Sequence, residues 1–176
     1  MKARVLIDTD IAIGEPNRDI DDALALVMAV NSPDLTIDSI TLTYGNDSLE
    51  NVLNSMGRLE GISSFPPLLS ASGAESSQDL GKATAATGLL ASQLEKDPAT
   101  IVAIGPLTNI ASLILLRPEL TSRVTEVIAV AGRRPGQLFR TGEHPRSHPD
   151  LNFERDPEAF AVLLGSQIPV VLAPFE

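Results

Sequence analysis

The chain has 176 residues, and its 13 lysine and arginine residues against 23 aspartate and glutamate residues give a formal net charge of −10. This acidic balance argues against a nucleic-acid binder, because affinity for phosphate backbones comes mainly from clustered cations. With 43% apolar residues, no cysteine and two histidines, the composition predicts one globular domain over residues 1–176 and excludes disulfides, thiolate sites and multi-histidine metal sites.

Short β-branched runs alternate along the chain with segments whose apolar residues recur at helical spacing. In chain order, the predicted elements are a strand at 4–7, a helix at 21–31, a strand at 36–42, a helix at 49–61, a strand at 67–70, a helix at 78–95, a strand at 100–104, a helix at 109–116, a strand at 126–131, a helix at 157–164 and a strand at 169–173. This alternation is typical of βαβ units, and the apolar strands indicate helices on both sheet faces. We therefore expect an open, mostly parallel, doubly wound α/β sheet of the Rossmann-like kind.

Three further features give expectations: a long irregular stretch, the end of the chain and the lack of a long apolar run. Residues 132–150 form the longest irregular stretch, and a loop of that length is typically functional or mobile. Three residues follow the last strand, so the chain is expected to end within the fold, with an open edge that favours a homo-oligomer or pairing with another chain. Because no apolar run approaches the ~20 residues of a membrane span and the N-terminus turns acidic early, we expect a cytoplasmic protein without a membrane partner.

A group of carboxylates follows the first predicted strand, at the end of the sheet where open α/β proteins bind ligands. Asp8 and Asp10 follow that strand, while Asp19, Asp21 and Asp22 lie at the start of the next helix. Carboxylates one residue apart in an extended chain point to the same side, so this group is expected to converge on a small volume. Ca²⁺ is the expected partner, ahead of Mg²⁺, because it accepts roughly 6–8 oxygen ligands of mixed kinds. In the alternative interpretation, Asp19 caps the helix and the other two favour its positive end.

Four sequence motifs then indicate a family. DTD at 8–10 followed by DIDDALAL at 19–26 resembles the aspartate-rich N-terminal signature of the inosine-uridine nucleoside hydrolases. The resemblance extends to TLTYGN at 41–46, VAIGPLTNIA at 102–111 and DLNFERDPEAF at 150–160, in the order of the family. It implies the family's fold and hydrolysis of the N-glycosidic bond of ribonucleosides to ribose and free base by a Ca²⁺-activated water, as in purine or pyrimidine salvage.

The resemblance also implies roles for individual residues. Asp10 is similar to the metal ligand that activates the attacking water, Asp22 to a second ligand, and Ile104 to the residue whose backbone carbonyl binds the metal. Asp8 is expected to support this cluster from below. The residues that the resemblance assigns to the sugar are Asp21, Asn46, Asp150 and Asn152.

Two asparagines have a structural alternative. Asn46, beside Gly45, is also typical of a left-handed turn after a strand. In the PLTN turn, Thr108 or Asn109 is expected to cap the following helix rather than contact a ligand.

The chain departs from the family pattern at three places. Residues 11–20 insert a loop before the second aspartate pair, which either bulges outward or displaces the helix that carries Asp22. Family members are longer and supply a C-terminal His-Asp pair that this chain lacks. In the divergent loop 132–150, His144 or His148 could replace the leaving-group acid, although solvated loop histidines are more usual. The alternative function is therefore a non-catalytic or truncated relative that acts as a metal-binding or nucleoside-binding module or a partner subunit.

Overall fold

A parallel sheet forms the centre of the protein. The computed structural model describes residues 2–62, 64–134, 136, 139–141, 146–148 and 150–174. The strands of the sheet are β1 (Ala3–Thr9), β2 (Leu35–Leu42), β3 (Ser70–Ser72), β4 (Ala99–Ala103), β5 (Val124–Ala129) and β8 (Val170–Leu172). Their spatial order is β3-β2-β1-β4-β5-β8, and each neighbouring pair is parallel. This arrangement confirms the predicted α/β fold.

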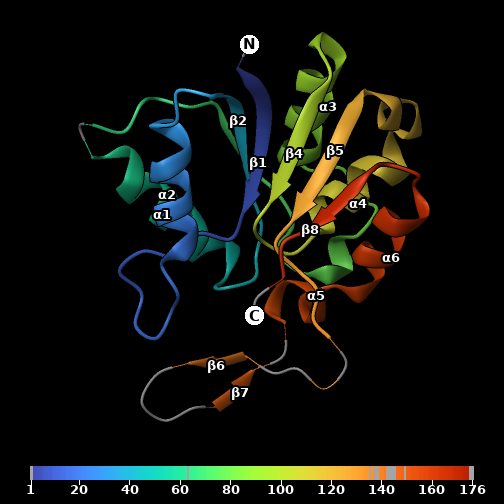
Figure 1. Cartoon of the computed structure of the whole chain (residues 1–176). Coiled ribbons are helices and arrows are strands. Elements are labelled where there is room, and N and C mark those ends of the chain that lie inside the picture. The colour runs from blue at the N-terminus through green and yellow to red at the C-terminus, as the bar shows by residue number, and fades with distance from the viewer. Residues whose placement is uncertain are drawn as a thin grey trace.

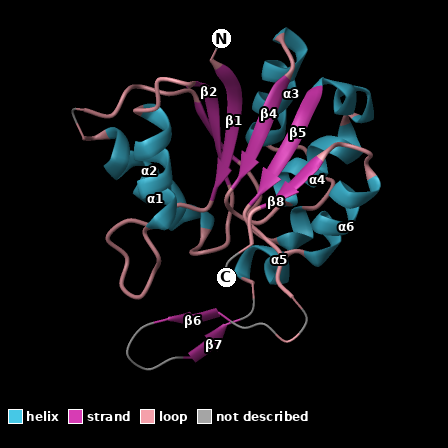
Figure 2. Cartoon of the chain, in the orientation of Figure 1, coloured by secondary structure: helices cyan, strands magenta, loops and turns pink. Residues whose placement is uncertain are grey.

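Helices cover both faces of the sheet, as Figures 1 and 2 show. The helices α1 (Asp21–Val30) and α2 (Leu49–Glu60) lie on one face. The other face carries α3 (Ala85–Lys96), α4 (Thr108–Leu116) and α6 (Pro157–Gly165). In the part of the chain that the structure describes, none of the helices is long and apolar enough to cross a membrane.

The alternation of side chains along the strands explains the two apolar layers. In β1, Leu6 belongs to the core under α3, α4 and α6, whereas its neighbours Val5 and Ile7 belong to the core under α1 and α2. In β4, Ile101 and Val102 divide between the same two layers. Successive strand residues point to opposite faces, so a strand covered on both sides must be apolar throughout.

Two elements differ from the prediction, the helix at 78–95 and the strand at 67–70. The helix predicted at 78–95 is divided into a 3₁₀ turn, η1 (Ser77–Asp79), and α3. Between them Gly81 has a φ of +79°, a left-handed conformation that interrupts the helix, and Thr84 starts α3 with a capping box. The strand predicted at 67–70 lies at Ser70–Ser72 instead, because the prolines that precede it have no N–H for a sheet ladder.

The stretch predicted to be irregular contains short elements. An antiparallel pair, β6 (Phe139–Thr141) and β7 (Arg146–His148), lies within it, and α5 (Leu151–Arg155) follows. A 3₁₀ helix, η2 (Pro118–Arg123), precedes β5 and was also not predicted. His144 lies outside the described residues, as does the side chain of His148, so the role suggested for them stays a prediction.

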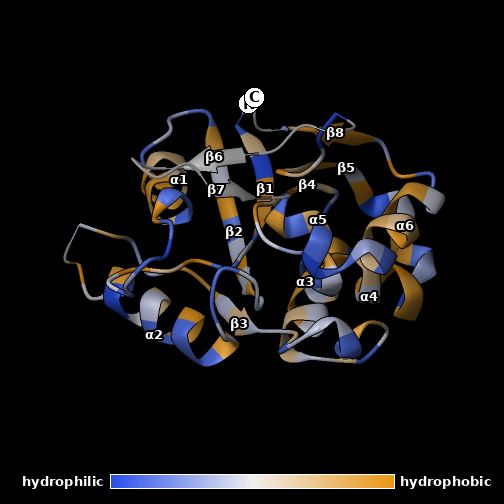
Figure 3. Cartoon of the chain, turned by 90° about the horizontal axis from the view of Figure 1, so that it is seen from below, coloured by the Kyte–Doolittle hydropathy of each residue, from blue (hydrophilic) through white to orange (hydrophobic). Residues whose placement is uncertain are grey.

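The order of the strands defines the position where a ligand is expected. From β1 the chain builds β2 and β3 on one side, and then returns to add β4, β5 and β8 on the other. The carboxyl ends of β1 and β4 therefore meet at a topological switch point, where the flanking loops separate. Figure 3 views the molecule from this end.

Candidate functional site

Three aspartates lie together at the switch point. Asp8, Asp10 and Asp22 expose 0%, 3% and 7% of their surface, and the first two lie at the end of β1. The Asp22 carboxylate, from the first turn of α1, accepts hydrogen bonds from the Thr9 hydroxyl at 2.5 Å and from the Asp10 backbone N–H at 3.2 Å. Asp21, the fourth carboxylate expected here, is exposed, and its charge raises the pKa of Asp22. The fold thus gathers carboxylates from two elements in a dry environment.

Burial makes the ionised form of these carboxylates costly. It raises the pKa of Asp8 from 3.8 to about 7, against the opposing effect of its hydrogen bonds with Thr41 and Asn109. Burial and then the neighbouring Asp22 charge hold the pKa of Asp10 well above its ordinary range. Burial is also the largest cause that raises the pKa of Asp22, to about 6. A cation among these groups would relieve both the desolvation and the mutual repulsion.

Glycines make room for the Asp10 carboxylate. A Cβ atom on Gly45, whose φ is +153°, would lie 2.1 Å from Asp10 Oδ2, and one on Gly105 would lie 3.0 Å from Asp10 Oδ1. The backbone N–H of Asn46 donates to Asp10 Oδ2 at 2.5 Å. The turn after β2 and the turn after β4 therefore form a cradle, in which a side chain at position 45 would overlap the carboxylate and one at position 105 would crowd it.

Asn109 supports Asp8, a role that the sequence did not predict. Its side-chain amide donates to Asp8 Oδ1 at 2.9 Å and to the carbonyl of Leu42 at 3.2 Å, and its oxygen accepts from the Ala74 N–H at 2.9 Å. A Cβ on Gly73 would lie 2.2 Å from the same oxygen. One buried amide thus joins α4 to β1, β2 and the loop after β3.

The helix-capping roles predicted for three polar residues are wrong. The N-cap position of α4 is Leu107 and that of α1 is Ile20, and neither has a side-chain capping bond. Their ψ angles, 9° and 8°, lie outside the extended region in which a capping side chain reaches back to the helix. Thr108 instead donates to Asp156 at 2.6 Å, and Asp19 is exposed.

Replacement of Asn109 by alanine is expected to reduce the free energy of unfolding by about 3 kcal/mol, because it leaves buried partners without a hydrogen bond. Urea denaturation measures this change. Asn31→Ala is the matched control, since the Asn31 amide donates to the carbonyl of Val27 at an exposed position. Equal losses in the two variants would contradict the supporting role of Asn109.

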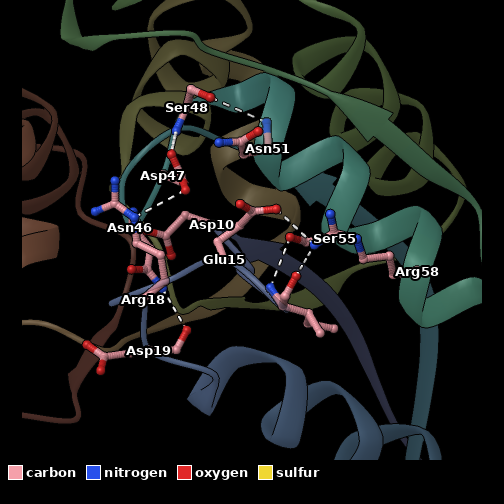
Figure 4. A network of polar contacts seen from close by, with 11 residues as sticks. Asp10, Glu15, Arg18, Asp19, Asn46, Asp47, Ser48, Asn51, Ser55 and Arg58 are labelled. Carbon is pink, nitrogen blue, oxygen red and sulfur yellow. Dashed lines mark hydrogen bonds and ion pairs between the residues drawn. The ribbon is translucent and has the colours of Figure 1, made fainter.

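The inserted loop 11–20 lies against α2, as Figure 4 shows. The Ile13 N–H donates to the hydroxyl of Ser55 at 2.9 Å, and Arg58 donates to the Glu15 carboxylate at 2.8 Å and to the carbonyl of Ile13. Left-handed conformations at Gly14 and Asn17, with φ of 76° and 59°, turn the loop. The loop therefore bulges outward along α2.

The far end of the loop is held at the site itself. The Asn46 side chain donates to the carbonyl of Asp19 at 2.9 Å, and Arg18 forms an ion pair with Asp47 at 3.1 Å (Figure 4). Asn46 thus binds the loop through its side chain and the Asp10 carboxylate through its backbone N–H. The insertion leaves α1 in a position from which Asp22 contacts Asp10, which answers the question that the sequence left open.

The remaining predicted site residues lie beside the ends of β4 and β5. The Asn152 amide donates to the carbonyls of Ile104 at 2.9 Å and Val130 at 2.8 Å. Asp150 caps α5 by accepting from the Phe153 N–H at 3.3 Å, and its other oxygen accepts from the Gly132 N–H. These contacts bring α5 to the switch point, while the metal role of Ile104 and the sugar roles of Asp150 and Asn152 stay predictions.

The donor set has the chemistry of a hard-cation site. Asp8 Oδ2 is buried and has no hydrogen-bond partner among the described residues. The other groups expected to bind the metal are the Asp10 and Asp22 carboxylates and the Ile104 carbonyl, which are all oxygen donors. Oxygen ligands favour Ca²⁺ or Mg²⁺ over softer metals. Within the described ranges, no group of three or more histidine, aspartate or glutamate side chains is placed so that it could hold a metal ion. The carboxylates therefore have the donor chemistry that a hard cation prefers, and carbonyl or water oxygens would have to complete its coordination.

Comparisons with known proteins identify the family of the chain. The family model described as inosine-uridine preferring nucleoside hydrolase matches residues 5–176. The chain is 30% identical over 181 residues to the pyrimidine-specific ribonucleoside hydrolase RihA of Salmonella typhi, and 32% identical over 181 residues to that of Escherichia coli O1:K1 / APEC. Each match covers 87% of this chain and 56% of the relative, so the chain spans about half the length of these relatives.

Solved structures show the same fold. An inosine-guanosine nucleoside hydrolase superposes with a TM-score of 0.77 at 23% identity, over 100% of this chain and 61% of that one. A purine-preferring ribonucleoside hydrolase from Gardnerella vaginalis gives a TM-score of 0.76 at 20% identity, over 97% of this chain and 60% of that one. The sheet and its helices are therefore those of nucleoside hydrolase structures.

Proposed function

The chain belongs to the inosine-uridine preferring nucleoside hydrolase family, and from that premise we propose that it hydrolyses the N-glycosidic bond of ribonucleosides to ribose and free base, with Ca²⁺ as its metal. The observation that carries this proposal is the burial of Asp8, Asp10 and Asp22 at the switch point of the sheet. Buried carboxylates that lie close together destabilise a fold unless a bound cation offsets their repulsion. Groups with such raised pKa values are typical of functional sites.

The chemistry follows from the charge that develops during cleavage. Loss of the base passes through an oxocarbenium-like sugar, so the site must present a water to the anomeric carbon and tolerate positive charge. Asp10 is the proposed base: its carboxylate, held by the Asn46 N–H between Gly45 and Gly105, accepts the proton of the attacking water. The negative cluster stabilises the cationic sugar.

The metal would be held by Asp10, Asp22 and the backbone carbonyl of Ile104, with Asp8 supporting them. When bound, Ca²⁺ lowers the pKa of a coordinated water and orients the ribose diol. Asn152, which donates to the Ile104 carbonyl at 2.9 Å, would fix the direction of that ligand. A carbonyl oxygen has two lone pairs, so this hydrogen bond leaves one for a cation.

The sugar would lie between the acid cluster and α5. Asp21, exposed at the start of α1, is the proposed acceptor for a ribose hydroxyl, and Asn46 would contact both sugar and carboxylates. Asp150 and Asn152 would bind the far end of the sugar. Their support is their position after the strands: Asp21 begins α1 after β1, Asn46 follows β2, and Asp150 and Asn152 lie at the start of α5 after β5.

The second candidate is a relative without turnover, which binds metal or nucleoside or pairs with a longer chain. It is favoured by the incomplete set of acidic ligands among the described residues. It predicts Ca²⁺ binding without release of ribose. The two candidates therefore differ in whether the protein releases ribose from nucleosides.

Release of ribose from a panel of purine and pyrimidine nucleosides, with Ca²⁺ and with chelator, tests the proposal. A working hydrolase releases ribose only with Ca²⁺, and Asp10→Ala removes the activity. A folded sample that binds Ca²⁺ and releases no ribose would favour the second candidate. Release that is insensitive to chelator would contradict the metal role.

Gly45→Ala is expected to weaken Ca²⁺ binding by at least about 10-fold, because the added Cβ would displace the Asp10 carboxylate that it meets at 2.1 Å. Calorimetric titration with Ca²⁺ measures the effect. Gly57→Ala is the matched control, since a Cβ at this α2 position meets nothing within 4 Å. Unchanged affinity in Gly45→Ala would show that Asp10 does not hold the metal.

A further inference from the structure

The inserted loop 11–20 contributes a backbone group to the candidate site. The carbonyl of Asp19 accepts a hydrogen bond from the side-chain amide of Asn46 at 2.9 Å, as Figure 4 shows, while the Asp19 side chain is exposed. Asn46 is a proposed sugar ligand, and its backbone N–H donates to Asp10 Oδ2 at 2.5 Å. The loop therefore contacts the one residue that is bonded to the proposed base and is also expected to meet the substrate.

This contact sets the direction of the Asn46 amide. An asparagine side chain has a donor NH₂ group and an acceptor oxygen, and rotation of the amide by 180° exchanges them. The Asp19 carbonyl can pair only with the NH₂ group, because the amide oxygen in its place would face a second acceptor. Among the described residues, none donates to Asn46 Oδ1, and Asn46 lines a pocket of about 220 Å³. The loop thus leaves the oxygen of this amide for a hydroxyl donor.

An ion pair holds the loop in this position. Arg18 Nε lies 3.1 Å from Asp47 Oδ2, and each partner is next in the chain to one partner of the Asn46–Asp19 hydrogen bond. Asp47 is itself fixed, because its side chain is only 11% exposed and its other oxygen accepts from the N–H of Ser48 at 2.7 Å. Ser48 is the N-cap residue of α2. The pair therefore attaches the end of the loop to the start of α2.

We propose that Arg18 is a positioning residue, which acts through the Asp19 carbonyl to orient the Asn46 amide toward a hydroxyl of the ribose diol. The inference rests on the proposed hydrolysis and adds to it the role of the inserted loop. An amide that is oriented before the substrate binds loses less side-chain entropy on binding, an effect of about 2- to 10-fold in affinity. Because residues 11–20 are an insertion relative to the family pattern, this support belongs to chains that carry the loop.

Deoxy analogues of uridine test the role of Arg18. Arg18→Gln is expected to lower kcat/KM by about 3- to 10-fold for uridine and equally for 5′-deoxyuridine, the effect of one weakened hydrogen bond. For the analogue that lacks the hydroxyl bound by Asn46, either 2′-deoxyuridine or 3′-deoxyuridine, the loss is expected to stay below about 2-fold, because that hydrogen bond is already absent. Equal loss on all four nucleosides, or no loss on uridine, would overturn the proposal.

Two further variants complete this comparison. Arg18→Lys keeps the charge that pairs with Asp47, so it is expected to restore kcat/KM for uridine to within about 2-fold of wild type. Arg117→Gln is the matched control, because Arg117 is 39% exposed against 40% for Arg18 and is also paired with carboxylates, far along the chain from the loop. A loss in Arg117→Gln as large as that in Arg18→Gln would contradict a specific role.

Nuclear magnetic resonance of the Asn46 side-chain amide separates this inference from the proposed activity. The amide proton bound to the Asp19 carbonyl is expected to exchange with solvent at least about 3-fold faster in Arg18→Gln than in wild type or Arg117→Gln. Asn46→Ala identifies the signal by its loss. This difference in a folded protein that releases no ribose would support the orienting role of Arg18 and reject the hydrolase proposal. Ribose release together with equal exchange in the three proteins would overturn the inference and leave the hydrolase proposal supported.

Discussion

Asp10→Asn is expected to lower the rate of Ca²⁺-dependent ribose release by about 10²- to 10⁴-fold, the range for loss of a general base. The amide has the shape of the carboxylate, so its hydrogen bond from the Asn46 N–H can persist. Because burial makes a charge at this position costly, the variant is also expected to be at least as stable as wild type in chelator. The combination of lost activity and retained stability distinguishes a catalytic role from a structural one.

The comparison needs an acidic residue nearby that does not enter the cluster. Asp19 lies in the loop 11–20 that follows Asp10, and its side chain is exposed, so Asp19→Asn is the matched control. Ribose release and urea denaturation are measured for both variants. Loss of stability in Asp10→Asn, with activity reduced only in proportion to the folded fraction, would contradict the assignment of the base.

In chelator, the free energy of unfolding is expected to fall as the pH rises from about 4 to about 7. The folded protein retains the Asp8 proton up to a pKa of about 7, whereas the unfolded chain loses it near 3.8. The unfolded state therefore binds fewer protons in this range, so stability is complete below the lower value and is lost as the pH approaches the upper one. Asp8 alone accounts for at most roughly 4 kcal/mol. Asp22, with a pKa of about 6, acts in the same direction.

Saturating Ca²⁺ is expected to flatten this profile, because a bound cation favours the ionised carboxylates. Urea midpoints at pH 5 and pH 7, with and without Ca²⁺, measure the effect, and Asp8→Asn should reduce the slope in chelator. The lowered pKa values of Asp47 and Asp79 act mainly below this range. Stability that increases between pH 5 and pH 7 in chelator would contradict the buried, protonated state of these carboxylates.

The alternation of strands and helices could be predicted because it depends on local patterns. A strand covered on both faces needs apolar residues at successive positions, as in β1 and β4, and this composition is visible without the fold. Element boundaries were less predictable where one residue decides them. Gly81 ends the turn before α3 by its left-handed conformation, which the apolar spacing of residues 78–95 does not reveal. Helix α5, of five residues, is too short for a periodic signal.

By itself, the sequence determined the class of fold, the family and the acidic cluster, because DTD and DIDDALAL are short motifs at the ends of two predicted elements. Only the tertiary structure decided which groups meet. Asn109 reaches Asp8 across 101 positions of sequence, and Tyr44 reaches the carbonyl of Arg155 across 111. Such contacts depend on the order β3-β2-β1-β4-β5-β8 and on glycines that admit close approach, as at Gly73 and Gly45. Local preferences of the chain do not encode these distances, because the packing of the two helical layers on the sheet sets them.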